Sequence, residues 1–105
     1  MNRLQTLEVY IKETPNDPFL HFAIAKEYES LGDVEKAVTR YELLMERYPE
    51  YVGTYYHAGK MYEKLHQIDR ALQCYERGLE QARIAKDRHS ASELAEAKES
   101  LEDSL

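Results

Sequence analysis

Few residues in this 105-residue chain have the type and spacing that catalysis requires. The single thiol, Cys74, could act as a nucleophile beside a histidine base, but no sequence pattern around it supports this. Carboxylate pairs such as Glu27 with Glu29, or Glu96 with Glu99, could supply an acid and a base. At helical spacing, however, acidic residues normally form a solvated face. We therefore predict no catalytic residue and no enzymatic activity.

The histidines and glycines offer no site for a metal ion or a cofactor either. No two histidines stand one helical turn apart, and no cysteine pair is present to complete a zinc site. The four histidines are His21, His57, His66 and His89. The four glycines are scattered, so no loop has the spacing that cradles a pyrophosphate. We expect no metal and no cofactor.

Length and charge exclude further classes. A chain of this size makes one domain. Lys and Arg number 14 and Asp and Glu number 20, which gives a formal charge of −6 and predicts no nucleic-acid partner. No apolar stretch approaches the roughly 20 residues that span a bilayer, so we expect no membrane partner. The N-terminus lacks the apolar run and cleavage site of a secretory signal, so we expect a cytoplasmic protein.

The elements that position these residues follow from an internal repeat with an offset of 34 residues. Residues 18–51, shifted by this offset, lie over residues 52–85, and Pro49 falls on Pro15, so the chain begins with half a unit. The matched pairs are Phe22 with Tyr56, Lys26 with Lys60, Tyr28 with Tyr62, Leu31 with Leu65, Ala37 with Ala71, Val38 with Leu72, Tyr41 with Tyr75, Glu42 with Glu76, and Met45 with Leu79. In each unit apolar residues recur every three or four positions in two runs, which predicts two helices.

Turn residues separate the predicted helices. Gly32 is placed for a left-handed helix end and Asp33 for the start of the next helix. In the second unit His66 takes the place of Gly32, in a conformation that histidine tolerates at some cost. Pro15 and Pro49 forbid helical continuation after the opening helix and after the first unit.

The second unit ends without a proline, because Arg83 stands at that position. We therefore predict one helix from Ile68 to about Ala85. A last amphipathic segment follows to the C-terminus, and Ser90 with Glu93 is predicted to form a capping box at its start. The apolar stripe of this segment comprises Ala91, Leu94, Ala97 and Leu101.

Two such helix–turn–helix units with small and tyrosine residues at fixed places resemble tetratricopeptide repeats. The residues that carry the resemblance are Ile24-Ala25, Tyr28, Leu31-Gly32, Ala37, Tyr41, Leu44 and Pro49 in the first unit, and Ala58-Gly59, Tyr62, Leu65, Ala71, Tyr75 and Gly78 in the second. The early aromatic of the family is Tyr55 in the second unit but His21 in the first. The resemblance implies an all-α fold, a right-handed α-solenoid of antiparallel helix pairs with about six helices.

The predicted architecture is a single domain. Its parts are an N-terminal half-repeat or capping helix at 1–15, repeats at 18–51 and 52–85, and a C-terminal capping helix at 88–105. Small side chains let adjacent helices approach closely, and large tyrosine rings fill the neighbouring holes. The small residues are Ala25, Ala37, Gly59, Ala71 and Gly78, the core tyrosines are Tyr28, Tyr41, Tyr62 and Tyr75, and Leu4, Leu7 and Ile11 are expected to face inward from the opening helix.

The resemblance also implies a concave groove, lined by the first helix of each unit, in which a peptide or protein segment binds. The groove-facing candidates are Phe19, Phe22, Lys26, Ser30, Tyr56, His57, Lys60 and Lys64. Lys26 and Lys60 are repeat equivalents, and with Lys64 they form a basic spot in an acidic protein. One hypothesis is a groove for a segment with acidic and apolar side chains. The other is that these lysines pair with Glu29 and Glu63 on a solvated face.

Two function classes follow. The first is a non-enzymatic adaptor or scaffold that binds a protein segment in the groove, as a monomer or weak homodimer. The second is an assembly element that docks through its end helices, which an exposed apolar strip on the last helix would favour. The lysine and asparagine pattern with which one subset of the family grips a C-terminal carboxylate is not reproduced by Phe22 and Lys26, so binding of chaperone tails is not supported.

Overall fold

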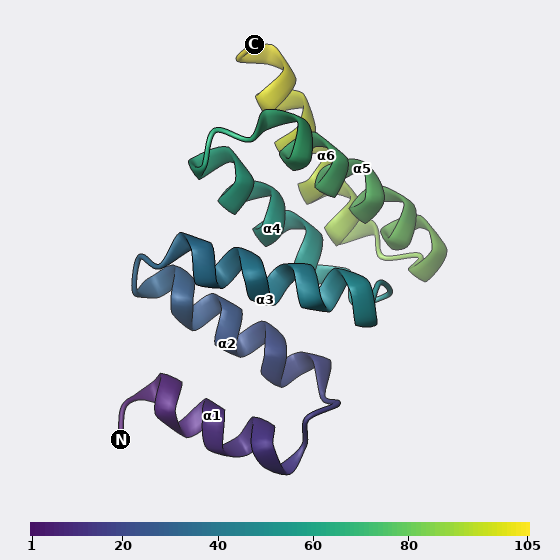
Figure 1. Ribbon diagram of the computed structural model, residues 1–105. Helices are drawn as coiled ribbons and strands as arrows, with labels where there is room; N and C mark the ends of the chain where they lie inside the picture. Colours follow the sequence, from purple (N-terminus) through teal and green to yellow (C-terminus); the bar gives the residue numbers. More distant parts are fainter.

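The computed structural model describes residues 1–105 as a stack of six α-helices without strands (Figure 1). The helices are α1 Arg3–Glu13, α2 Pro18–Ser30, α3 Val34–Arg47, α4 Gly53–Lys64, α5 Ile68–Ala85 and α6 Arg88–Asp103. Each helix packs against the next, α4 also packs against α6, and the two chain ends lie at opposite ends of the stack. The predicted all-α solenoid of helix pairs is confirmed, and α5 has the predicted bounds.

An aspartate caps the last helix, and the capping box predicted for Ser90 and Glu93 is wrong. The Asp87 carboxylate accepts hydrogen bonds from the Ser90 amide, at 3.0 Å, and from the Ser90 hydroxyl, at 2.7 Å. Helix α6 therefore begins at Arg88, where the predicted C-terminal capping helix begins, and only the cap residue differs from the prediction. An ionised carboxylate is a stronger acceptor for an exposed helix amide than a serine hydroxyl, and it also suits the positive end of the helix dipole.

The turns inside the two repeats have the predicted left-handed residues. Gly32 has φ +77° and His66, its equivalent, has φ +58°. Asp33 caps α3 by accepting a hydrogen bond from the Lys36 amide at 3.1 Å, as its position indicates. In the left-handed region a Cβ atom crowds the following carbonyl, so His66 has a conformational cost that Gly32 avoids.

Replacing His66 with glycine should therefore stabilise the protein. We expect His66→Gly to raise the free energy of unfolding by up to about 1 kcal/mol, measured by urea denaturation. His66→Ala is the matched control, because it removes the imidazole but keeps a Cβ atom in the left-handed conformation. If alanine stabilised the protein as much as glycine, the gain would come from loss of the ring and not from relief of the backbone.

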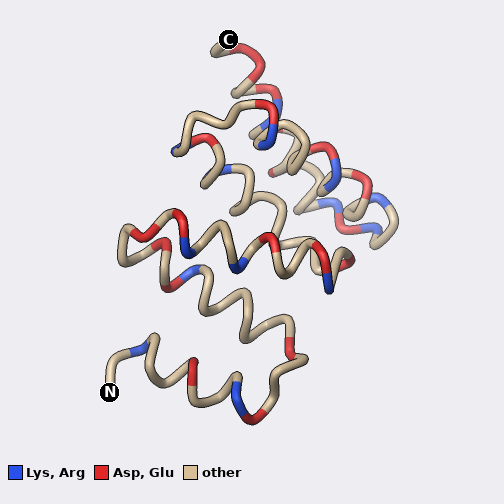
Figure 2. The backbone as a smooth tube through the Cα atoms, viewed as in Figure 1, with Lys and Arg blue, Asp and Glu red and all other residues tan.

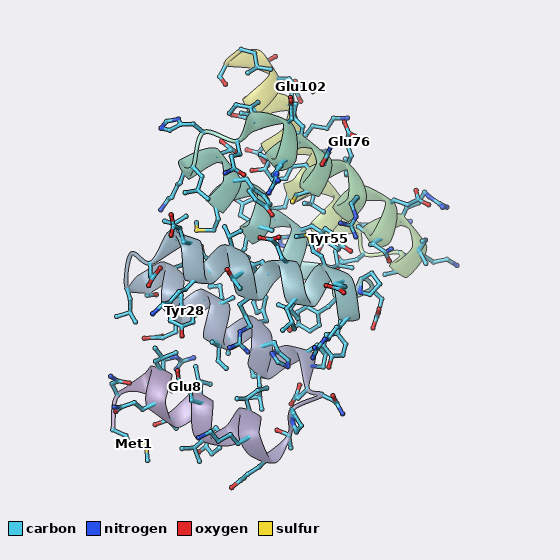
Figure 3. The ribbon with its side chains drawn as sticks, viewed as in Figure 1. Met1, Glu8, Tyr28, Tyr55, Glu76 and Glu102 are labelled. Carbon is cyan, nitrogen blue, oxygen red and sulfur yellow. The ribbon has the colours of Figure 1, made fainter.

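The main core lies between α2 and α6 and is built around tyrosines. Tyr41, Tyr55 and Tyr75 are completely buried, Tyr62 is buried, and Tyr28 is half-buried at the edge. Figure 3 marks Tyr55 where α3, α4 and α5 come together. The sequence predicts core positions for the other four but gives no role to the Tyr55 ring. Gly78 lets α5 approach α4 closely at this residue, because a Cβ atom at Gly78 would lie 2.5 Å from Cβ of Tyr55.

A second, smaller core joins α1 to α2. Leu7 packs with Ala23 and Ile24, and the half-buried Leu4 and Ile11 lie beside them. The predicted inward face of the opening helix is confirmed. Helix α1 thus covers α2 as the second helix of a preceding unit would.

His21 and Tyr55 occupy equivalent positions and make the same hydrogen bond. The Tyr55 hydroxyl donates to the carbonyl oxygen of Pro49 at 2.6 Å, and Nε2 of His21 lies 2.7 Å from the carbonyl oxygen of Pro15. Nδ1 of His21 lies 2.9 Å from the Arg40 guanidinium, which can only donate. Nε2 therefore carries the proton, and His21 fastens the start of its unit as the aromatic residue does in the next.

Candidate binding groove on helices α2, α4 and α6

The two first helices of the repeats, α2 and α4, each have an uncharged first half and a charged second half. In α2 the charged residues begin at Lys26, and in α4 they begin at Lys60 (Figure 2). Both helices run in the same direction in Figure 1, so their like halves lie on the same side of the stack. The face that they form has an aromatic end and a charged end.

The aromatic end is a cluster of rings that spans both repeats. The centre of the Phe22 ring lies 5.4 Å from the centre of the His57 ring, edge to face, and 5.5 Å from the centre of the Tyr51 ring. His57 also lies 5.5 Å from Tyr56 and stacks on Tyr41 at 6.1 Å. These are the distances at which aromatic pairs attract beyond their burial. The predicted residues Phe22, Tyr56 and His57 are therefore brought together, and all three are half-exposed.

Glu29 connects the first repeat to the second. Its carboxylate lies 3.2 Å from Nδ1 of His57 and accepts a hydrogen bond from the Tyr41 hydroxyl. Burial alone would raise the pKa of Glu29, but the hydrogen bonds and the charges of His57 and Lys26 outweigh it, so the pKa lies below its ordinary value. Glu29 is therefore ionised at neutral pH. Glu63, its repeat equivalent, accepts the same bond from Tyr75.

Acid should weaken the protein through Glu29. A carboxyl whose pKa is lowered by folding stabilises the native state above its unfolded pKa, and this contribution is lost as the pH falls through the lower native value. We expect the free energy of unfolding to fall less steeply between about pH 6 and about pH 3 in Glu29→Gln than in the wild type. Glu8→Gln, an exposed change on α1, is the control and should keep the wild-type slope. Equal slopes for all three proteins would refute this role of Glu29.

The lysines at the charged end differ in their partners. Nζ of Lys60 lies 3.8 Å from Glu63 and 5.6 Å from the centre of the Tyr56 ring. Lys26 and Lys64 are exposed and form no ion pair. Pairing with glutamate on a solvated face therefore describes Lys60 only, whereas Lys26 acts on the Glu29 pKa through its charge without forming an ion pair.

The two remaining candidates lie at the exposed margins of this face. Phe19, in the first turn of α2, has 60% of its surface exposed. Ser30, the last residue of α2, is exposed and makes no side-chain hydrogen bond. Phe19 forms no ring pair with the aromatic cluster.

Helix α6 extends this face beyond α4. Comparison of the sequence with itself at the repeat offset of 34 residues does not reveal this. A cleft of about 270 Å³ lies between α4 and α6. Its lining residues are Tyr56, Lys60, Glu93, Glu96, Ala97 and Ser100. Because α5 runs on without a proline, the offset here is 36 residues, which brings His57 onto Glu93, Lys60 onto Glu96 and buried Ala58 onto buried Leu94. Allowing for this longer helix would reveal α6 as the first helix of a third unit.

The single thiol of the chain, Cys74, belongs to α5 and lies outside this face. Cys74 is buried, and burial raises the pKa of its thiol to about 11, so little thiolate exists at neutral pH. No group of three potential metal ligands comes together. None of the six helices is both long and apolar enough to cross a bilayer.

Comparison with known proteins agrees with this geometry. The family model described as tetratricopeptide repeat matches residues 20–51 and again residues 52–84. The chain belongs to the tetratricopeptide repeat family. Tetratricopeptide repeats generally serve as protein–protein interaction modules and are typically not enzymes.

Three solved structures superpose well on this chain. A tetratricopeptide repeat domain protein from Salinibacter ruber, in a crystal structure, is 41% identical with a TM-score of 0.81, covering 84% of this chain and 98% of that one. A solution NMR structure of a tetratricopeptide repeat domain protein from the same organism is 42% identical with a TM-score of 0.81. The match covers 85% of this chain and 90% of that one. A protein from Bordetella parapertussis shares the fold at 20% identity, with a TM-score of 0.85. The match covers 99% of this chain and 90% of that one. Comparison with curated proteins found no match.

Proposed function

We propose that this protein is a binding module that holds a segment of a protein partner along the face of α2, α4 and α6. The segment presents apolar or aromatic side chains to the ring cluster around Phe22 and His57. It presents acidic side chains to Lys26 and Lys64. This polarity follows from the division of α2 and α4 into an aromatic half and a charged half.

The observation that carries the proposal is the set of half-exposed rings beside cations that lack partners. The edges of Phe22, Tyr56 and His57 remain accessible although the rings pack on one another. Lys26 has no carboxylate partner, so its ammonium can pair with a ligand without breaking an existing ion pair. Rings held in place by their neighbours also lose little freedom when a ligand covers them.

Acidic residues of α6 set the direction of the segment. Glu93 and Glu96 line the cleft opposite Lys60, so this part of the face repels acidic side chains. The acidic residues of the ligand therefore lie toward Lys26, and neutral or basic residues lie toward α6. Lys60, which already pairs with Glu63, separates the two regions.

Selection from a library of displayed random peptides tests this proposal. We expect enrichment of sequences that combine aromatic or aliphatic residues with acidic ones at one end. Lys26→Glu combined with Lys64→Glu should weaken binding of the selected peptides by about tenfold or more, since two favourable charges become unfavourable. Lys12→Glu with Lys36→Glu makes the same change in net charge outside this face and should leave binding nearly unchanged. Equal binding by both double variants would exclude the α2–α4–α6 face.

Assembly through α1 is the second candidate. Val9 and Tyr10 lie side by side in α1 with 42% and 51% of their surfaces exposed. Leu94, Ala97 and Leu101 of α6 are buried, so the last helix has no exposed apolar strip of the kind that would favour docking there. Light scattering at micromolar concentration would support this candidate if it showed a dimer that Tyr10→Lys dissociates. A monomer for both proteins would exclude it.

A further inference from the structure

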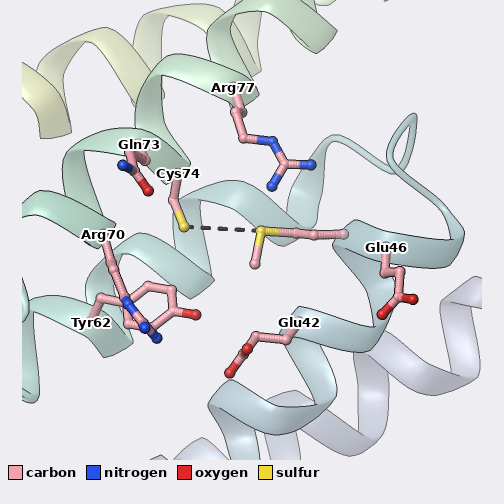
Figure 4. Close-up of a pocket in the computed structure, with 8 residues that line it drawn as sticks. Glu42, Glu46, Tyr62, Arg70, Gln73, Cys74 and Arg77 are labelled. Atoms are coloured by element: carbon pink, nitrogen blue, oxygen red, sulfur yellow. Dashed lines mark hydrogen bonds between the residues drawn. The ribbon is translucent and has the colours of Figure 1, made fainter.

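A second cleft lies between α3 and α5, the second helices of the two repeats (Figure 4). Its volume is about 460 Å³, within the range of pockets that bind ligands. The lining residues are Glu42, Met45, Glu46, Tyr62, Arg70, Gln73, Cys74 and Arg77. None of them belongs to the face proposed above to bind a partner, so this cleft is a separate feature of the surface.

The two walls of the cleft carry opposite charges. Glu42 and Glu46 lie one helical turn apart on α3, a rise of about 6 Å, and Arg70 and Arg77 lie two turns apart on α5, about 10.5 Å. None of the four takes part in an ion pair, either across the cleft or along its own helix. Two acceptors and two donors of strong ionic hydrogen bonds are therefore left for a ligand.

Aromatic rings already hold both arginines in position. The guanidinium of Arg70 lies 5.9 Å from the centre of the Tyr62 ring, and that of Arg77 lies 5.6 Å from the centre of the Tyr55 ring. The Tyr55 ring is fixed by complete burial and by its bond to Pro49. A guanidinium that rests on a rigid ring loses less freedom when it binds a carboxylate than a free side chain does.

The floor between the walls consists of Met45, Cys74 and Tyr62, and none of these side chains is ionised at neutral pH. The Cys74 thiol lies 3.9 Å from the Met45 sulfur, and its pKa, raised by burial, keeps it protonated. The Tyr62 hydroxyl lies between the walls: burial raises its pKa, Glu42 raises it further and Arg70 opposes them. Such a floor suits a peptide backbone and side-chain methylenes, while the walls provide the polar contacts.

Successive side chains of an extended chain point in opposite directions, and those on one side recur about every 6.6 Å. That repeat is close to the rise of about 6 Å between Glu42 and Glu46 along α3, whereas Arg70 and Arg77 stand about 10.5 Å apart along α5, so the match to the arginine wall is one of charge and not of spacing. We propose that the cleft binds an extended protein segment in which basic and acidic residues alternate. The basic side chains turn toward Glu42 and Glu46, and the acidic ones turn toward Arg70 and Arg77.

Fluorescence anisotropy with two labelled peptides tests this assignment. One peptide alternates lysine and glutamate over eight residues, and the other has the same composition with all lysines before all glutamates. We expect the alternating peptide to bind at least about tenfold more tightly at low salt, because only it turns all its basic side chains toward one wall and all its acidic side chains toward the other. Equal binding of the two peptides, or no binding of either, would overturn the proposal.

Charge reversal of one wall, then of both, gives the decisive comparison. Glu42→Lys with Glu46→Lys, or Arg70→Glu with Arg77→Glu, makes both walls alike in charge and should weaken the alternating peptide about tenfold or more. Reversing all four residues restores opposite walls, and the peptide binds again with its two edges exchanged. Loss of binding in that fourfold variant, with its helices intact by circular dichroism, would refute the alternating occupant.

Two further controls distinguish binding in this cleft from binding elsewhere on the chain and from self-association. Lys26→Glu with Lys60→Glu should leave binding of the alternating peptide unchanged, whether or not these changes weaken binding of other peptides on the α2–α4–α6 face. A reduced affinity in that variant would place the peptide on that face and overturn the assignment. Sedimentation that showed a wild-type dimer, dissociated by reversal of one wall, would identify a second copy of this chain as the occupant instead.

Discussion

Replacing Tyr75 with alanine is expected to lower the free energy of unfolding by about 3–5 kcal/mol, the usual cost of removing a buried aromatic ring. The ring is completely buried and lies directly against Gly59 of the facing helix. Because a glycine cannot extend into the space that the ring leaves, a cavity would remain between α4 and α5. The change also removes the hydroxyl that donates to Glu63. Urea denaturation at neutral pH measures the loss.

Two variants separate the ring from the hydroxyl and from general effects of tyrosine removal. Tyr75→Phe keeps the ring and should retain more than half of the stability lost in Tyr75→Ala. Tyr10→Ala, at a position 51% exposed on α1, should change the free energy of unfolding by less than about 0.5 kcal/mol. If Tyr75→Ala were as mild as Tyr10→Ala, the tyrosines would not be the core of the repeats.

Adding a single methyl group at Gly78 should also destabilise the protein. A Cβ atom there would lie 2.5 Å from Cβ of Tyr55 and 3.0 Å from Cδ1 of Leu94, so α4 would have to move and the Leu94 side chain would have to give way. Overpacking of this kind costs about 1–3 kcal/mol, more than the gain of about 1 kcal/mol from replacing a helical glycine. We therefore expect Gly78→Ala to lower the midpoint of thermal unfolding, measured by circular dichroism.

Gly53→Ala is the matched control for this prediction. Its Cβ atom would lie 3.7 Å from the Phe22 and Tyr51 rings, an ordinary contact distance. The substitution also improves helix propensity near the start of α4, so stability should stay level or rise. A gain for both variants would show that α4, α5 and α6 do not meet as closely as the structure indicates.

The repeat and its core could be predicted from the sequence because the two units place the same residue types at equivalent buried positions, so the pattern occurs twice. Equivalent residues such as Tyr41 and Tyr75 are buried in equivalent holes, and their glutamate partners also stand 34 residues apart. The turn at Gly32 and its variant at His66 were predictable for the same reason. Local chemistry, repeated at a fixed offset, decides these features.

Features that depend on contacts between distant residues could not be predicted in this way. His21 replaces an aromatic residue, and only the structure shows that its imidazole reaches the Pro15 carbonyl as the Tyr55 hydroxyl reaches that of Pro49. The cap at Asp87 was missed because a serine-and-glutamate pattern three residues later competes with it in the sequence.

The candidate site was predictable in part. Phe22, Tyr56 and His57 do gather on one face, as the resemblance to tetratricopeptide repeats implies. The role of Glu29 was not foreseen, because its partner His57 has no equivalent in the first repeat, where Ala23 stands. The part played by α6 was hidden by the two extra residues that follow from the long α5.

Chemical-shift mapping by NMR tests most directly that the α2–α4–α6 face is the binding surface. A peptide selected against the protein is added to the isotope-labelled chain, and the backbone amide signals are followed. Binding on this face predicts the largest shifts at Phe22, Lys26, Tyr56 and Lys60, with smaller ones at Glu96. Shifts confined to α1, α3 and α5, with these residues unchanged, would contradict it.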